Sequence, residues 1–234
     1  MEKVFIGVGH GGNDPGAVAG KLKEKDIALN IALACKDELQ RHNVEVKLSR
    51  YKDENDDIME EVRECNNFKP KLAVDIHVNA GGGDGFEAFH HYRGGLGKTL
   101  AANIETEVKK IGQNSRGLKT RVGSSGRDYY AFIRETVCPS IILEVAFIDT
   151  KDIEIVDELH EQKMFGIAYA KGILKTLGIS YKENGSIPDG ITKEQFAAFK
   201  KLVNKGLVSE NYWKNKLNKP ITAAEIMEIV SKII

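Results

Sequence analysis

Hydrophobic and polar residues follow two different spacings along the first three quarters of the chain. Short apolar runs, as at residues 4–8 and 72–76, predict buried strands, whereas apolar residues three and four apart at 26–39 predict an amphipathic helix. Further strands are expected at 44–48, 86–92, 129–133 and 141–148, and further helices at 58–68, 96–111 and 153–177. Strands that alternate with helices predict an α/β fold with a mostly parallel sheet.

This periodicity ends at residues 178–190, a stretch with three glycines, a proline, serine and asparagine, which is a composition typical of a linker. The chain is therefore expected to have a domain at 1–178, a linker at 179–190 and a small helical module at 191–234. A module of this size suits docking or binding better than a second enzyme. Its tryptophan, Trp213, is either a binding residue or the core of a helical bundle.

The composition excludes several classes of protein. With 41% hydrophobic residues among 234, the chain can bury a substantial core. Lys and Arg together number 34, as do Asp and Glu, so no net charge favours nucleic-acid binding. No apolar stretch is long enough for membrane insertion.

The cysteines and the N-terminus bear on the compartment. The three cysteines are odd in number and widely spaced, which favours buried free thiols over a disulfide framework. Met1 leads directly into a strand without a signal-peptide pattern, so synthesis in the cytoplasm is expected.

Two histidines stand at the carboxyl ends of predicted strands. His10 follows the first strand and opens onto a glycine-rich turn, and His77 follows the strand at 72–76 and precedes Asn79. Ligand sites in open α/β sheets gather at this end of the strands, and histidines are common zinc ligands. A turn histidine and a hydrogen-bonded core histidine are the structural alternatives.

Two glutamates complete a candidate hydrolytic set. Glu24 begins the first long helix, where a glutamate also favours the helix dipole. Glu144 interrupts the apolar run 141–148, and a buried carboxylate is costly unless it is paired or bound. Burial would raise the pKa of Glu144 and suit it to acid–base catalysis, while a buried ion pair is its structural alternative. Two histidines and a glutamate can bind zinc with water as fourth ligand, and the second glutamate then takes a proton from that water.

Five segments, in chain order, resemble the motifs of one known family: GHGGNDPGA (9–17), KEKDIALNIA (23–32), DIHVNA (75–80), GFEAF (85–89) and PSIILEVAFI (139–148). Over about residues 1–177 the chain resembles the zinc-dependent N-acetylmuramoyl-L-alanine amidases of the type-3 amidase family. The resemblance implies a twisted, mostly parallel six-stranded sheet between helices, and hence an amidase catalytic domain at 1–178. It also implies one Zn²⁺ ion held by His10, Glu24 and His77, with Glu144 as the catalytic base.

Other positions match the family pattern or depart from it. Glu87 and Asn79 are expected beside the site, as supporting or substrate-contacting residues. Arg116 is expected to contact substrate, with a solvated basic loop as the equal alternative. Arg50 is expected to be structural. Asp75 stands where serine is more usual before the third-motif histidine, so the pocket is expected to differ in shape while activity is kept.

The function implied by the resemblance is hydrolysis of the amide bond between N-acetylmuramic acid and L-alanine in bacterial peptidoglycan. The missing signal-peptide pattern and short C-terminal module favour a phage or prophage endolysin, which reaches the wall after holin-type release or lysis. The module at 191–234 is expected to bind wall polymer or to mediate self-association. Two alternatives stay open: a zinc carboxypeptidase-like hydrolase of another peptide, and a non-catalytic wall-binding protein, against which the intact Glu144 argues.

Overall fold

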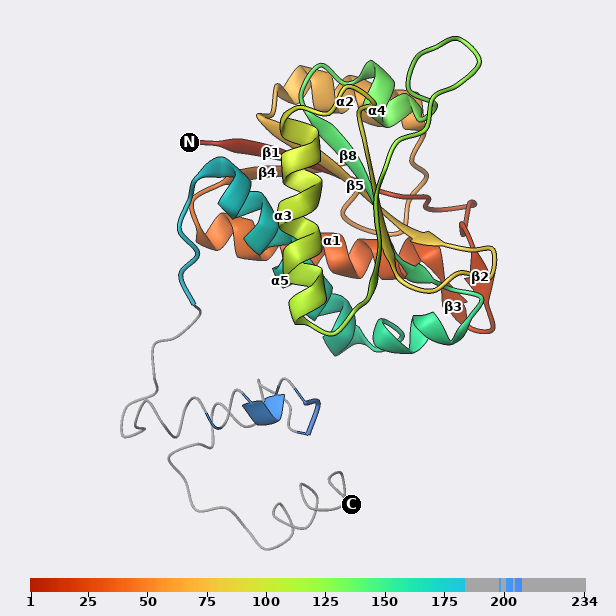
Figure 1. Cartoon of the computed structure of the whole chain (residues 1–234), viewed down its shortest axis with the longest axis vertical. Helices are drawn as coiled ribbons and strands as arrows, with labels where there is room; N and C mark the ends of the chain where they lie inside the picture. Colours follow the sequence, from red (N-terminus) through yellow and green to blue (C-terminus); the bar gives the residue numbers. More distant parts are fainter. Residues whose placement is uncertain (184–197, 199–200, 204, 208–234) are drawn as a thin grey trace, which may run out of the picture. The chain divides into compact units, whose positions relative to one another are not determined.

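The computed structural model describes residues 1–183, 198, 201–203 and 205–207 (Figure 1). The chain divides into two units, Met1–Tyr181 and Lys182–Ile234, and all the elements below belong to the first. Most of the expected linker at 179–190 and of the expected module at 191–234, with Trp213, lies outside the described residues.

A six-stranded sheet forms the centre of the first unit, in the order β4-β1-β5-β8-β6-β7. These strands are β1 (Lys3–Val8), β4 (Glu45–Leu48), β5 (Leu72–Asn79), β6 (Phe86–His90), β7 (Ser115–Lys119) and β8 (Ser140–Phe147). Neighbouring strands run parallel, except that β6 and β8 are antiparallel. The mostly parallel six-stranded sheet expected from the sequence is confirmed.

Helices cover both faces of this sheet (Figure 1). They are α1 (Glu24–Arg41), α2 (Ile58–Phe68), α3 (Leu96–Lys110), α4 (Ala131–Glu135), α5 (Leu159–Leu177) and the 3-10 helix η1 (Lys151–Ile155), and a short hairpin of β2 (Val18–Ala19) and β3 (Leu22–Lys23) precedes α1. Residues of α1, α3 and α5 form one core with the sheet, and residues of α2 and α4 form another. None of the described helices combines the length and apolarity needed to cross a membrane.

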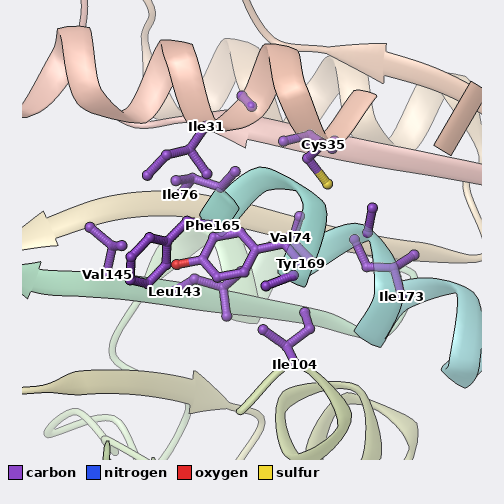
Figure 2. Packing of buried hydrophobic residues seen from close by; sticks show 14 of the residues in the cluster. Ile31, Cys35, Val74, Ile76, Ile104, Leu143, Val145, Phe165, Tyr169 and Ile173 are labelled. Carbon is purple, nitrogen blue, oxygen red and sulfur yellow. The ribbon is translucent and has the colours of Figure 1, made fainter. Parts of the chain in front are cut away.

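The larger core lies between the sheet and α1, α3 and α5 (Figure 2). Tyr169 of α5 is fully buried there, with its ring centroid 6.2 Å from those of Phe86 and Phe165. Because both faces of the sheet are covered, interior strands such as β1 and β8 are mostly apolar.

The smaller core, on the face under α2 and α4, gives way to polar residues toward the carboxyl ends of the strands. Ala73 and Ile142 belong to this core. Since side chains on a strand alternate between faces, Asp75, His77 and Glu144 continue the same face. The polar residues of the candidate site therefore stand directly beyond an apolar layer.

Several expectations about secondary structure are wrong, among them the single helix at 153–177, which is divided into η1 and α5. Residues 129–133 were expected to form a strand, but α4 occupies this region. Phe132 and Ile133 are neighbours and both lie in the core under α2, an arrangement that a helical turn permits and a strand does not. The edge strand β7 was not expected, because Leu118 is its only apolar residue.

Candidate metal centre and catalytic face

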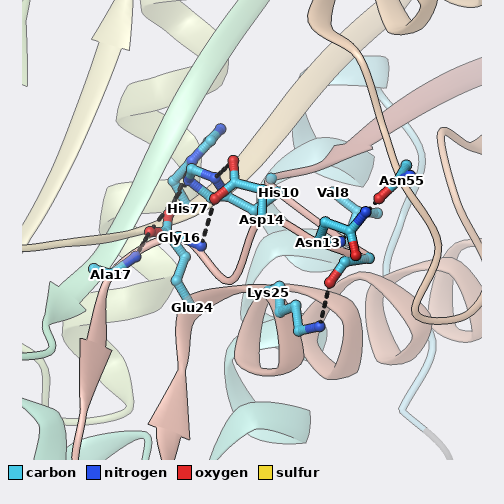
Figure 3. A network of polar contacts seen from close by, with 12 residues as sticks. Val8, His10, Asn13, Asp14, Gly16, Ala17, Glu24, Lys25, Asn55 and His77 are labelled. Atoms are coloured by element: carbon cyan, nitrogen blue, oxygen red, sulfur yellow. Dashed lines mark hydrogen bonds and ion pairs between the residues drawn. The ribbon is translucent and has the colours of Figure 1, made fainter.

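Three side chains from separate parts of the chain converge at the carboxyl ends of β1 and β5. His10 follows β1, Glu24 is the first residue of α1, and His77 lies near the end of β5. One ligand atom from each lies within 4.8 Å of the others. Glu24 Oε2 is 3.3 Å from His10 Nε2, and Glu24 Oε1 is 3.0 Å from His77 Nδ1 (Figure 3). The cluster can hold a metal ion.

Two glycines make this convergence possible. A Cβ on Gly9 would lie 2.5 Å from Cε1 of His77, and a Cβ on Gly16 would lie 2.6 Å from Oε2 of Glu24. His10 between them has a φ of 62°, in the left-handed region that residues with a side chain rarely occupy. The turn thus folds back tightly enough to bring His10 beside Glu24.

Both imidazoles use their second nitrogen to bind a carboxylate. Nδ1 of His10 is 2.7 Å from Oδ2 of Asp14, and Nε2 of His77 is 3.0 Å from Oδ2 of Asp75. Carboxylates in this position hold the ring orientation and tautomer of metal-binding histidines. The donor set, two oriented imidazole nitrogens and one carboxylate, therefore suits a zinc ion with an open fourth position.

Glu24 is buried, and its environment nevertheless favours the charged form. Its two oxygens accept hydrogen bonds from the backbone N–H of Ala17 at 2.8 Å and of Val78 at 2.9 Å. Burial by itself raises the pKa of Glu24, but the hydrogen bonds with His10 and His77 outweigh burial and hold that pKa well below its usual range. A fixed negative charge therefore lies at the centre of the cluster.

The histidines respond in the opposite direction. The hydrogen bond with Glu24 is the main cause that raises the pKa of His10. Burial lowers the pKa of His77, but the charge and hydrogen bond of Asp75 raise it well above its usual range. Because a metal-binding nitrogen must be free of its proton, metal binding at this site would release protons.

Glu144 shares a row of the sheet with His77. The two residues are register partners in the parallel pair of β5 and β8, and Glu87 is the partner of Glu144 in the antiparallel pair of β6 and β8. Register partners point to the same face, so all three side chains stand on the face that carries the cluster. Glu144 is half-buried, and burial is the main cause that raises its pKa to about 7.

The surroundings of Glu144 also bear on its structural alternative, a buried ion pair. Within residues 1–183, no hydrogen bond or ion pair to the Glu144 carboxylate is found. A buried ion pair is therefore not what places a glutamate in the middle of β8. A carboxylate with a pKa near 7 can both accept and return a proton at neutral pH.

Three further candidate residues, Asn79, Glu87 and Arg116, lie together, because the first and the last both donate hydrogen bonds to the carboxylate of Glu87. Glu87 Oε1 accepts hydrogen bonds from Arg116 Nε and Lys119 Nζ, and Glu87 Oε2 accepts one from Asn79 Nδ2 at 3.2 Å. Burial raises the pKa of Glu87, but the two cations lower it below its usual range. Arg116 also lies 5.3 Å from the ring centroid of Phe147. Arg116 lies on the strand β7 and not in a loop, and it pairs with Glu87 although 44% of its side chain is exposed to solvent.

Two groups of polar residues around the turn were missed by sequence reasoning. Lys25 Nζ donates to the carbonyl of Gly12 at 2.8 Å (Figure 3). It also donates to Asp53 Oδ2 at 2.7 Å. The orienting carboxylates Asp14 and Asp75 were missed as well. The spacing of Asp75 could have revealed its role, since Asp75 stands two residues before His77 on one strand and therefore points to the same face.

Arg50, which was expected to be structural, contacts backbone carbonyls beside the site. It is buried, with 1% of its surface exposed, and donates to the carbonyls of Val8, Gly9 and Lys25 at 3.1, 3.2 and 2.7 Å. These carbonyls flank the two places where His10 and Glu24 enter the site. Arg50 thus ties the end of β1 to the first turn of α1.

The chain matches known proteins along most of its length. Residues 4–175 match the model of the family described as N-acetylmuramoyl-L-alanine amidase. The sporulation-specific N-acetylmuramoyl-L-alanine amidase of Bacillus subtilis (strain 168) is 32% identical over 90% of this chain and 80% of that protein. The endolysin of Bacillus phage SPP1 is 35% identical over 79% of this chain and 69% of that protein. The solved catalytic domain of the N-acetylmuramoyl-L-alanine amidase CwlV from Bacillus (Paenibacillus) polymyxa var. colistinus aligns with a TM-score of 0.69 and 28% identity, over 77% of this chain and 100% of that one.

Proposed function

Because this chain belongs to the N-acetylmuramoyl-L-alanine amidase family, it hydrolyses the amide bond that joins N-acetylmuramic acid to L-alanine in peptidoglycan, and we propose that it uses one zinc ion held by His10, Glu24 and His77. The observation that carries the proposal is the pair of carboxylates, Asp14 and Asp75, that orient the two imidazoles toward Glu24. When bound, zinc acidifies water and polarises the scissile carbonyl.

Glu144 is the proposed catalytic base. Its carboxylate stands in the same row as His77 and has no competing hydrogen-bond donor in the described part of the chain. In this role it accepts a proton from the attacking water and returns it to the nitrogen of the departing L-alanine. A pKa of about 7 is close to the value at which one group does both.

Glu87, Arg116 and Asn79 are proposed to border the substrate. Glu87 is the register partner of Glu144, and Arg116 and Lys119 bring positive charge to the same edge of the catalytic face. In the proposed arrangement the glutamate holds the two cations in place, and the cations attract a carboxylate of the peptide.

The test compares Glu144→Gln with Glu154→Gln, a matched change at an exposed glutamate of η1. We expect Glu144→Gln to keep its zinc and to clear purified cell walls about 10²–10⁴-fold more slowly, while Glu154→Gln keeps both. Chelator should stop clearing by the wild type, and added zinc should restore it. Undiminished clearing by Glu144→Gln would refute the role of this residue.

Analysis of the products distinguishes the remaining alternatives. Digested walls should gain free N-terminal alanine, which the carboxypeptidase-like alternative does not release. Appearance of C-terminal amino acids instead would exclude the amidase reaction. A protein that binds walls and liberates neither product would be the non-catalytic alternative.

We also propose that the chain is a phage or prophage endolysin whose residues 191–234 bind the wall. The similarity to a phage endolysin supports this role, while the similarity to a sporulation enzyme supports a rival one. Produced inside bacteria, an endolysin should lyse them only after the membrane is permeabilised. Trp213→Ala in the full-length Glu144→Gln background should weaken sedimentation with walls if Trp213 contacts wall polymer; unchanged sedimentation would place it in the module's own core.

A further inference from the structure

Two of the three cysteines meet although 72 residues separate them in the chain. Cys65 is fully buried on α2, and Cys138, just before β8, is half-buried. Cys65 belongs to the smaller core and Cys138 packs against that core, and each thiol shifts the pKa of the other. Cys35 is fully buried in the larger core, on the other face of the sheet.

The backbone on both sides of this contact is held in place. The side-chain amide of Asn66, next to Cys65, donates to the carbonyl of Glu135 at 3.0 Å and accepts from the N–H of Val137 at 2.9 Å. On the far side of Cys138, the carbonyl of Pro139 accepts from the N–H of Ala73 on β5 at 3.0 Å. The chain segments that carry the two cysteines are therefore held side by side by the fold.

We propose that Cys65 and Cys138 are a redox-active pair that closes to a disulfide when the protein meets an oxidising small-molecule disulfide. This modification site shares no residue with the metal cluster, and its chemistry does not use the proposed zinc ion. The bond would join α2 to the start of β8, the strand that carries Glu144.

The two thiols take different parts in the reaction. Cys138 is the more exposed of the two, and the hydrogen bond from Cys65 lowers its pKa below the usual range for a thiol. The Cys138 thiolate attacks one sulfur of the small-molecule disulfide and releases one thiolate. Cys65 then attacks Cys138 Sγ in the mixed disulfide and releases the second. The protein loses two electrons and two protons, and the reagent gains both as two free thiols.

The test uses the full-length protein with oxidised glutathione. In the wild type and in Cys35→Ser, we expect intact mass to fall by two hydrogens, and peptide mapping without reductant to recover Cys65 joined to Cys138. The number of thiols that react after denaturation should fall from three to one in the wild type. The unfolding midpoint should rise by about 5 °C, because the bond closes a long loop.

Single variants distinguish the roles of Cys65 and Cys138 in the reaction. Cys65→Ser should stop at a stable glutathione adduct on Cys138, whereas Cys138→Ser should gain almost no adduct because Cys65 is buried. A wild type that keeps the glutathione adduct, or that keeps all its thiols, would overturn the proposal. Wall clearing serves as a check on folding, and the oxidised protein should retain it because neither cysteine is among the proposed metal ligands, the proposed base or the proposed substrate-contacting residues.

Discussion

Oδ2 of Asp75 lies 3.0 Å from Nε2 of His77, two residues further along β5. Asp75 has only 2% of its surface exposed, so this contact is shielded from water. It leaves Nδ1 of the imidazole to face Glu24. Asp75, one of the positions expected to depart from the family pattern, therefore orients a proposed metal ligand.

Replacing Asp75 with serine tests this relationship. We expect Asp75→Ser to weaken zinc binding about 10–100-fold, the usual effect of losing a carboxylate behind a metal-binding histidine. Competition with a chromophoric chelator measures the affinity. Asp84→Ser, at an exposed position in the loop before β6, is the matched control and should leave affinity unchanged. Equal affinities for the two variants would show that Asp75 does not support the ligand.

The pH dependence of the reaction should follow Glu144. A base works as the carboxylate, so kcat/KM should rise with pH up to about 7 and fall in acid as Glu144 takes up a proton. Burial is the main cause of the raised pKa, His77 lowers it, and the charges of Glu24, Asp75 and Glu87 raise it further.

Glu87→Gln removes one of these negative neighbours. We expect the acid limb of kcat/KM to move to lower pH by roughly half a unit, because Arg116 and Lys119 lose their counter-charge as well. Rates measured across a pH series locate the midpoint, and Glu154→Gln should not move it. A shift to higher pH would contradict the electrostatic account of Glu144.

Arg50→Lys should destabilise the protein by about 3 kcal/mol. Lysine cannot span the separate carbonyls that the guanidinium reaches, and each buried carbonyl left without a donor costs about 1–3 kcal/mol. Urea denaturation measures the change, with Arg63→Lys on the exposed side of α2 as control. Equal midpoints for these two variants would refute the anchoring role of Arg50.

Glu61→Gln should stabilise the protein at neutral pH. Glu61 Oε1 and Asp75 Oδ1 are buried without a hydrogen-bond partner among the described residues, and both lie within 2.7 Å of where a Cβ on Gly7 would stand. Burial, and then the charge of Asp75, raise the pKa of Glu61 well above its usual value. The folded protein therefore keeps a proton on Glu61 that the unfolded chain loses above its ordinary pKa of 4.5.

The sign of the effect follows from proton uptake on folding. Stability falls as pH rises above 4.5, until the folded-state pKa is passed. Glutamine does not titrate, so at pH 8 the variant should be more stable than the wild type by about 1.4 kcal/mol for each unit by which folding raises the pKa of Glu61, and near pH 4 it should gain almost nothing. Denaturation at both values checks this, and a gain confined to acid would contradict it.

The sequence by itself determined the order of the main strands and helices, because strands that are covered on both faces appear in the sequence as short apolar runs. It also indicated two candidate metal ligands and the candidate base, since His10 and His77 follow such runs and Glu144 interrupts another. These features depend on neighbours in the chain, and local spacing records them.

Only the tertiary structure decided the rest. The helix at Ala131–Glu135 forms because two adjacent apolar residues both face α2, and β7 forms because the edge of β6 is open to a strand with little apolar content. Arg50 donates hydrogen bonds to backbone carbonyls that are far from it in the sequence. Cys65 and Cys138, also far apart in the sequence, lie at the same core. Local periodicity cannot encode such pairs, because they exist only once the layers have packed.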